Sequence, residues 1–273
     1  MMTGTLYCIP VPLAADLPMS TALTADGQAV TAALDAFVVE NARTARAFLK
    51  TLALRVPLQQ IAMREIDAGT DDATLDAMLA PLREGRDLGL MSEAGCPGVA
   101  DPGARLVARA HLSGLRVVPL VGPSSLLLAL MASGLNGQAF AFVGYLPAQP
   151  AEREQRLREL EQRSARHDET LLAIETPYRA QAWLESALRV LAPGTRLTLA
   201  AALTTATQSV VTRTVAQWRA SPPELGKALV VFAWQAEPQP AAGRPRADAA
   251  GTRPVPARGR AAAPPGARGP RRR

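Results

Sequence analysis

Cysteine, histidine and aromatic residues are scarce in this chain of 273 residues, and their scarcity excludes several kinds of site. The only cysteines are Cys8 and Cys96, and the only histidines are His111 and His167. Such a small set builds neither a disulfide framework nor a histidine-rich metal cluster. We therefore expect both cysteines to be packing residues and no metal to be bound. Aromatic residues make up 4% of the chain, so alanine, leucine and valine must fill the core.

Long hydrophobic runs are also absent. No apolar run is longer than the one over residues 126–132, whereas a helix that crosses a bilayer needs about 20 apolar residues. No lysine or arginine precedes the first apolar run, although a positive segment is typical of a secretory signal. We expect a soluble, cytoplasmic protein with no secretory signal and no membrane contact.

Positive charge is concentrated at the C-terminal end of the chain. The net charge is +6, but residues 236–273 carry nine arginines against Glu237 and Asp248, so the rest of the chain is close to neutral. This Pro/Ala/Arg-rich segment has almost no large hydrophobic residue and cannot offset its ordering entropy by burial. We predict a disordered basic tail. Its arginines could contact RNA phosphates without sequence preference, although a solvated tail is the simpler interpretation.

The N-terminal part alternates β-prone runs with segments of helical periodicity. Short β-prone runs occupy residues 5–10, 36–40, 60–65, 87–92 and 115–120. Helical segments occupy residues 16–32 in part, 41–50, 74–84, 102–113 and 124–133, the last two followed by glycine. Such an alternation predicts an α/β fold with a doubly wound, parallel-rich sheet.

The pattern changes near the Gly144-Tyr-Leu-Pro147 segment. A charged helix is predicted over residues 151–167, followed by β-prone runs at 170–174, 196–203, 209–214 and 227–234, with helices at 180–191 and 215–220. This order favours a mixed or antiparallel sheet. We predict an N-terminal α/β domain (1–146), a C-terminal α/β domain (147–235) and the tail (236–273), with a ligand cleft between the two domains.

The most informative segment is residues 87–125. Two β-prone runs there lead directly into turns rich in glycine, proline, serine and acidic residues, Ser92-Glu-Ala-Gly-Cys-Pro97 and Gly122-Pro-Ser-Ser125. In an open α/β sheet, ligands bind outside the carboxyl ends of the strands, where such loops gather. Small residues let the backbone approach a ligand closely. These two turns therefore predict a binding site.

Seven motifs stand in a characteristic order along residues 3–235. They are Gly4-Thr-Leu-Tyr7, Glu40-x-x-Arg43-Thr44, Ser92-Glu-Ala-Gly-Cys-Pro97, Asp101-Pro-Gly103, Val117-Val-Pro-Leu-Val-Gly-Pro-Ser124, Gly144-Tyr-Leu-Pro147 and Glu175-Thr-Pro-Tyr-Arg179. Together they resemble the tetrapyrrole methylase superfamily, and within it the branch that methylates ribose 2′-hydroxyl groups of small-subunit ribosomal RNA. The resemblance implies a two-domain methyltransferase that forms a homodimer and holds S-adenosyl-L-methionine in the cleft.

The resemblance also assigns roles to single residues. Those implied to bind the cofactor are Pro12, Glu93, Ala94, Gly95, Val99, Ala100, Ser124, Ser125, Glu175, Thr176 and Leu203. Ser124 and Ser125 open a predicted helix, so a serine there could cap the helix as well as contact a ligand. In-line methyl transfer needs alignment of donor and acceptor and no metal.

Several charged positions of the related RNA enzymes are missing. Asn41 follows Glu40 where those enzymes carry an acidic residue, and residues 62–65 and 201–205 lack a histidine-rich stretch and an Arg-Glu-Leu-Thr-Lys block. The loop at residues 10–15 also lacks a Gly-Asn pair. Glu40, Arg43 and Glu65 remain as candidates for a base or a stabilising cation near a hydroxyl. We favour Glu40 as the base, and Arg43 could bind a phosphate or simply be solvated.

Three interpretations stay open. The chain could methylate ribosomal RNA or the small ribosomal subunit, could methylate a small molecule such as a tetrapyrrole, or could be a dimeric protein that binds S-adenosylmethionine without catalysis. An electropositive face beside the cleft favours the first interpretation, and a closed apolar cleft favours the second. Intact cofactor binding without a methyl acceptor favours the third.

Overall fold

A computed structural model describes residues 3–238. The chain divides into a compact unit, Met1–Gln239, and the segment Pro240–Arg273. The predicted disordered tail therefore lies almost entirely outside the described residues, and the helices and strands belong to the first unit.

The first sheet is built from the N-terminal part of the chain. Its five strands are all parallel and lie in the order β3-β2-β4-β1-β5. Their bounds are β1 Thr5–Cys8, β2 Ala36–Val39, β3 Ala62–Glu65, β4 Leu88–Met91 and β5 Arg116–Pro119. The predicted parallel sheet is confirmed, since each of these strands falls within a β-prone run of the sequence.

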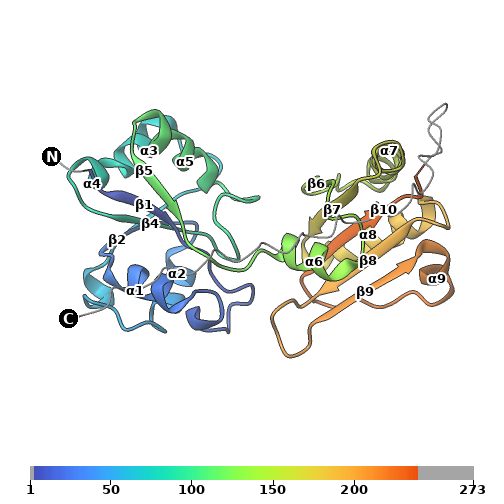
Figure 1. Ribbon diagram of the computed structural model, residues 1–273, viewed down its shortest axis with the longest axis horizontal. Helices are drawn as coiled ribbons and strands as arrows, with labels where there is room; N and C mark the ends of the chain where they lie inside the picture. The colour runs from blue at the N-terminus through green and yellow to red at the C-terminus, as the bar shows by residue number, and fades with distance from the viewer. Residues whose placement is uncertain (1–2, 239–273) are drawn as a thin grey trace, which may run out of the picture. The chain divides into compact units, whose positions relative to one another are not determined.

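Helices cover both faces of this sheet, as Figure 1 shows. The helices are α1 Ala25–Ala33, α2 Ala42–Leu49, α3 Asp72–Met78, α4 Ala80–Arg83 and α5 Gly103–Leu112, with short 3-10 turns at Met19–Thr21 and Leu58–Gln60. Successive strand residues point to opposite faces: Val38 packs in the cluster of α3 and α5, whereas Phe37 and Val39 pack in the cluster of α2. The helix predicted over residues 74–84 is divided into α3 and α4, because Pro81 lacks the N–H that a continuous helix needs there.

The second sheet is mixed, as the sequence predicts. Its order is β6-β7-β10-β8-β9, with a parallel β6–β7 pair and antiparallel pairs elsewhere. Its elements are α6 Ser125–Ser133, β6 Phe140–Phe142, α7 Pro150–His167, β7 Thr170–Glu175, α8 Pro177–Val190, β8 Arg196–Ala201, β9 Ser209–Thr214, α9 Val215–Ala220 and β10 Val230–Gln235. Phe232 and Trp234 of β10 pack with α8 on one face, and Val231 and Ala233 pack with α6 on the other.

The passage from the first sheet to the second precedes the predicted boundary at residue 146. Helix α6 packs on the second sheet through Ala129 and Leu130, and β6 pairs with β7. The chain thus leaves the first sheet after Pro119 and joins the second at Ser125. The division into an N-terminal domain (1–146) and a C-terminal domain (147–235) stays a prediction.

Two further findings concern the described part of the chain. None of its helices is both long and apolar enough to cross a membrane. Residues 3–238 also contain no group of three or more histidine, cysteine, aspartate or glutamate side chains arranged to hold a metal ion.

Candidate functional site

Three loops at the carboxyl ends of β1, β4 and β5 are tied together. Val11, after β1, forms an isolated antiparallel bridge with Gly95, after β4, with N···O distances of 2.9 and 3.2 Å. The thiol of Cys96 lies 3.3 Å from the carbonyl oxygen of Pro123, after β5. The loops that the sequence marks as a binding site are therefore held beside one another at one edge of the sheet.

The loop after β4 has an unusual backbone. Gly95 has a φ of +71°, and a Cβ atom there would lie 3.2 Å from Cδ2 of Leu13, so glycine is the residue that this turn accepts. Ala100 has a φ of +67°, and Ala202, after β8, has a φ of +49°. Left-handed backbone at residues other than glycine costs free energy and tends to persist at binding sites. Both alanines line a cavity.

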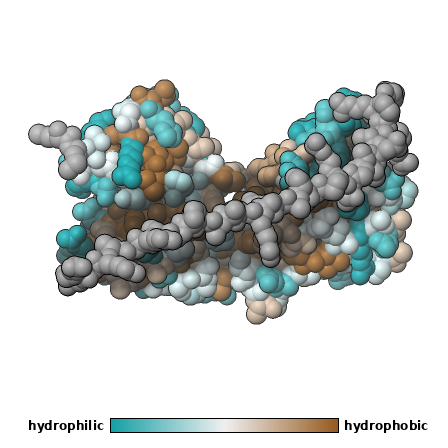
Figure 2. Space-filling model, in the orientation of Figure 1, coloured by the Kyte–Doolittle hydropathy of each residue, from teal (hydrophilic) through white to brown (hydrophobic). Residues whose placement is uncertain are grey.

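This cavity of about 440 Å³ opens among these loops and the second sheet. Its volume is within the range of pockets that bind small molecules. Its walls are mainly apolar and come from Leu13, Val99, Leu126, Phe142, Ile174, Leu203, Leu229, Val230 and Val231. On the face drawn in Figure 2, hydrophobic residues gather in patches that hydrophilic residues border.

Three carboxylates, Glu40, Glu93 and Asp101, line the same cavity. The backbone N–H of Glu93 donates to Oε2 of Glu40 at 3.0 Å, and Oε1 of Glu93 accepts from the hydroxyl of Thr44 at 3.0 Å. Burial, with the nearby charges of Glu40 and Glu93, raises the pKa of Asp101 to about 6. The cluster therefore concentrates negative charge in the cavity.

Glu175 and Tyr145 add polar groups from the second sheet. The carboxylate of Glu175 is buried, and its Oε1 accepts from the backbone N–H of Thr176 at 2.8 Å. Nη2 of Arg179 lies 2.8 Å from Oε2 of Glu175, outside hydrogen-bond geometry, and Oε2 accepts no hydrogen bond within residues 3–238. Burial and the charge of Glu175 raise the pKa of Tyr145, which also lines the cavity.

Most of the residues that the resemblance marks for the cofactor lie around this cavity. Nine of the eleven are among its lining residues: Glu93, Ala94, Gly95, Val99, Ala100, Ser124, Ser125, Glu175 and Leu203. Pro12 and Thr176 are not, although each is next in sequence to a lining residue, Leu13 and Glu175. Ser124 also caps α6, its hydroxyl accepting from the N–H of Leu127. The role of each residue stays a prediction.

The catalytic candidates separate in the structure. Glu40 lines the cavity, whereas Arg43 and Glu65 do not. Oε1 of Glu65 instead accepts from the backbone N–H of Ala42 at 2.8 Å, at the start of α2. Sequence reasoning gives no role to Asp101 or Tyr145, although both belong to motifs of the chain, Asp101-Pro-Gly103 and Gly144-Tyr-Leu-Pro147.

The chain is a two-sheet α/β protein. Its five-stranded parallel sheet is followed by a five-stranded mixed sheet, and carboxylates line a cavity at the strand ends. Residues 19–218 match the family described as Tetrapyrrole (Corrin/Porphyrin) Methylases. The chain belongs to this family.

Relatives of known name point to one branch. "Ribosomal RNA small subunit methyltransferase I" of Mesorhizobium japonicum is 40% identical over 148 residues, which are 54% of this chain and 47% of that protein. The protein of the same name from Neisseria meningitidis serogroup B is 31% identical over 216 residues, 78% of this chain and 69% of that protein. The chain spans about half the length of several curated relatives that it matches.

A solved structure agrees with the fold. The crystal structure of the methyltransferase CobJ has a TM-score of 0.56 and 20% identity, and the match covers 86% of this chain and 94% of that one. At this level of identity, the likeness shows the fold alone.

Proposed function

We propose that this chain is an S-adenosyl-L-methionine-dependent methyltransferase that acts on small-subunit ribosomal RNA, at a ribose 2′-hydroxyl group. The observation that carries the proposal is the single cavity lined by nine of the eleven residues that the family resemblance marks for the cofactor. Membership of the methylase family supports the reaction. The names of the two relatives, which specify ribosomal RNA, support the RNA substrate over a small molecule.

The chemistry of the cavity fits this cofactor. Apolar side chains such as Leu13, Val99 and Ile174 offer walls for an adenine ring. The sulfonium and ammonium groups of S-adenosylmethionine are positive, so the carboxylates of Glu40, Glu93 and Asp101 favour it electrostatically.

When bound, S-adenosylmethionine would supply a sulfonium methyl group to the ribose oxygen; the C–O bond would form as the S–CH3 bond breaks, and S-adenosylhomocysteine would leave. The residues of the cavity align the two reactants. We assign proton removal from the hydroxyl to the carboxylate of Glu40, whose Oε2 is oriented by the N–H of Glu93. Arg43 lies outside the cavity lining, so we assign it no contact with the reacting atoms.

Exposed apolar side chains support the proposed homodimer. Leu127 and Met131 of α6 are 56% and 78% exposed, although the opposite side of α6 packs on the second sheet. Exposed apolar groups on one element are typical of interaction surfaces. Met131→Lys should shift the protein toward monomer in analytical ultracentrifugation, whereas Leu112→Lys on α5 should not.

Because the proposed substrate is ribosomal RNA, we expect a cytoplasmic protein.

The first test is calorimetric titration of S-adenosylmethionine into the wild type and Ala94→Trp. Ala94 is exposed at the cavity wall, so the tryptophan should fill the cavity without disturbing the core. Binding should weaken by at least about 100-fold, roughly 2.7 kcal/mol. Ala151→Trp, at an exposed site on α7 away from the cavity, is the matched control.

The second test is methyl transfer to small ribosomal subunits that lack the modification, with the product nucleoside identified by mass spectrometry. A 2′-O-methyl nucleoside supports the proposal. Cofactor binding with no transfer to the subunit would overturn the RNA substrate and leave the small-molecule or non-catalytic interpretation. Absence of binding by the folded wild type would overturn the methyltransferase proposal itself.

A further inference from the structure

Helix α2 carries a row of positive side chains that have no partner in the described structure. Arg43, Arg46 and Lys50 form neither an ion pair nor a side-chain hydrogen bond with any of residues 3–238. Most other described lysines and arginines are engaged, either by a carboxylate, as Arg189 is by Glu154, or by a backbone carbonyl, as Arg64 is by Ala77. Eight described lysines and arginines have no such partner, and three of them therefore stand together on this helix; the other five are Arg55, Arg116, Arg166, Arg213 and Lys227.

The three cations lie on one exposed face of α2. Positions three and seven residues apart share a side of a helix, and all three residues are exposed. At 1.5 Å per residue, they extend along about 10 Å of the helix axis. A row of cations of this length can contact more than one phosphate of an RNA backbone.

The same helix is fixed directly to the cavity. Glu40, which lines the cavity, precedes α2 by two residues, and the side chain of Asn41 caps the helix by accepting from the N–H groups of Arg43 and Thr44. The hydroxyl of Thr44 then donates to Glu93, a second lining residue, at 3.0 Å. A molecule held on the face of α2 would therefore lie next to the cavity mouth.

The helix itself gains nothing from the charge at Arg43. A positive side chain in the first turn opposes the helix dipole, and the carboxylate that meets this end of α2 is that of Glu65, which accepts from the N–H of Ala42 and forms no ion pair with Arg43. Arg46 and Lys50 lie near the C-terminal end, where a cation stabilises the helix. The charge of Arg43 thus adds nothing to the stability of α2 and is free to meet an external anion.

We propose that the exposed face of α2, formed by Arg43, Arg46 and Lys50, binds phosphates of the RNA backbone and so presents the target ribose to the cavity. The inference rests on the proposed RNA methyltransferase function. Glu40, Glu93 and Asp101 outnumber the one lysine, Lys227, among the residues that line the cavity, so phosphates are repelled from it. Cations outside the mouth hold the backbone while the ribose enters.

The test measures how tightly two proteins bind small ribosomal subunits that lack the modification, at a series of salt concentrations. The proteins are the wild type and the triple variant Arg43→Gln/Arg46→Gln/Lys50→Gln. Affinity of the triple variant should fall by at least about tenfold near 0.1 M salt, and the slope of log K against log salt should decrease by about 2 to 3. The matched control is Arg116→Gln/Arg166→Gln, which removes two exposed cations on β5 and α7 and should leave both quantities unchanged. Circular dichroism checks that each variant is folded.

A second variant separates charge from shape. Arg43→Lys/Arg46→Lys keeps the charges and should retain most of the affinity, since a phosphate accepts a lysine as a point charge. Unchanged affinity and slope in the triple variant, while the wild type binds and methylates the subunit, would overturn the role of α2 and leave the proposed function intact. Failure of the wild type to bind the subunit, with S-adenosylmethionine still bound, would overturn the RNA substrate and this inference together.

Discussion

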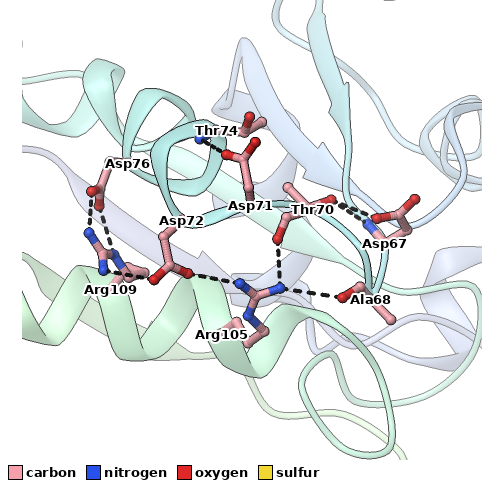
Figure 3. Close-up of polar contacts among 9 residues, drawn as sticks. All are labelled: Asp67, Ala68, Thr70, Asp71, Asp72, Thr74, Asp76, Arg105 and Arg109. Carbon is pink, nitrogen blue, oxygen red and sulfur yellow. Dashed lines mark hydrogen bonds and ion pairs between the residues drawn. The ribbon is translucent and has the colours of Figure 1, made fainter.

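Helices α5 and α2 each carry two arginines about one turn apart, but only the arginines of α5 are paired with carboxylates. On α5, Arg105 lies 2.8 Å from Asp72, and Arg109 pairs with both Asp72 and Asp76, as Figure 3 shows. Arg105 also donates to the backbone oxygens of Ala68 and Thr70. On α2, no carboxylate of the described chain pairs with Arg43 or Arg46. The first pair of arginines joins α5 to α3, and the second pair is left for another molecule.

The carboxylates of the two regions differ in the same way. The hydrogen bond and charge of Arg109 lower the pKa of Asp76. Burial and the charges of Glu40 and Glu93 raise the pKa of Asp101. Opposite charges are paired at the α3–α5 surface and are not paired around α2, where Glu40 and Glu93 line the cavity and the side chains of Arg43 and Arg46 are exposed. Separated charges retain the electrostatic potential that binds a charged ligand.

The largest expected effect comes from converting the α2 face into a paired surface. Ala47 is exposed between the three cations, so Ala47→Glu would place a carboxylate four residues from Arg43 and three from Lys50. Affinity for small ribosomal subunits should fall about tenfold, while the helix stays folded. Ala47→Gln, with the same size and no charge, is the control. Equal affinity in both variants would contradict an electrostatic role for α2.

A smaller effect is expected from the cavity carboxylate. The folded pKa of Asp101, about 6, exceeds its unfolded value of about 3.9, so its contribution to stability is present below about pH 4 and is lost as pH rises through 6. Asp101→Asn should remove this pH dependence of the unfolding temperature between pH 4 and 7. Because the ionised form favours a cationic ligand, wild-type affinity for S-adenosylmethionine should rise severalfold from pH 5 to pH 7.5. If the unfolding temperature of the wild type changed between pH 4 and 7 in the same way as that of Asp101→Asn, the pKa of Asp101 would not be raised.

At the α3–α5 surface, removing the carboxylates should affect stability and not RNA methylation. Asp72→Asn/Asp76→Asn leaves Arg105 and Arg109 without their ionic partners and should lower the unfolding temperature modestly, since the groups are partly exposed. The lowered pKa of Asp76 means that its contribution is present above about pH 4 and is lost at lower pH. The difference between wild type and variant should therefore vanish on acidification. Loss of methylation at neutral pH with an unchanged unfolding temperature would contradict the structural role.

Most of the fold is predictable because local sequence patterns indicate its helices and strands. Buried strands such as β2 and β4 are short apolar runs between turns, and the loops after them carry glycine and proline. Strand β6 escapes prediction, since three residues give no periodicity. The packing of α6 on the second sheet escapes it too, because helix periodicity shows an apolar helix but not which sheet it covers.

The site is predictable where a motif carries it and not where distant residues meet. Ser124 and Gly95 stand in motifs, whereas Phe142 and Lys227 join the cavity only through the tertiary fold. The separation of Arg43 from Glu40 is likewise invisible in the sequence. Two residues three positions apart in one motif diverge because the chain turns from strand to helix between them, at the capping residue Asn41.

The smallest expected effect comes from replacing one arginine on each of the two helices, α2 and α5. Arg43→Gln removes a cation that has no partner in the described structure and that opposes the dipole of α2, so the free energy of unfolding should change by no more than about 0.5 kcal/mol and could increase. Arg109→Gln removes a side chain that bridges Asp72 and Asp76, so it should lower stability. Urea unfolding of both variants measures the difference, and subunit binding should show the reverse order. A greater loss of stability in Arg43→Gln than in Arg109→Gln would mean that α2 has a structural partner, and its arginine would then belong with those of α5.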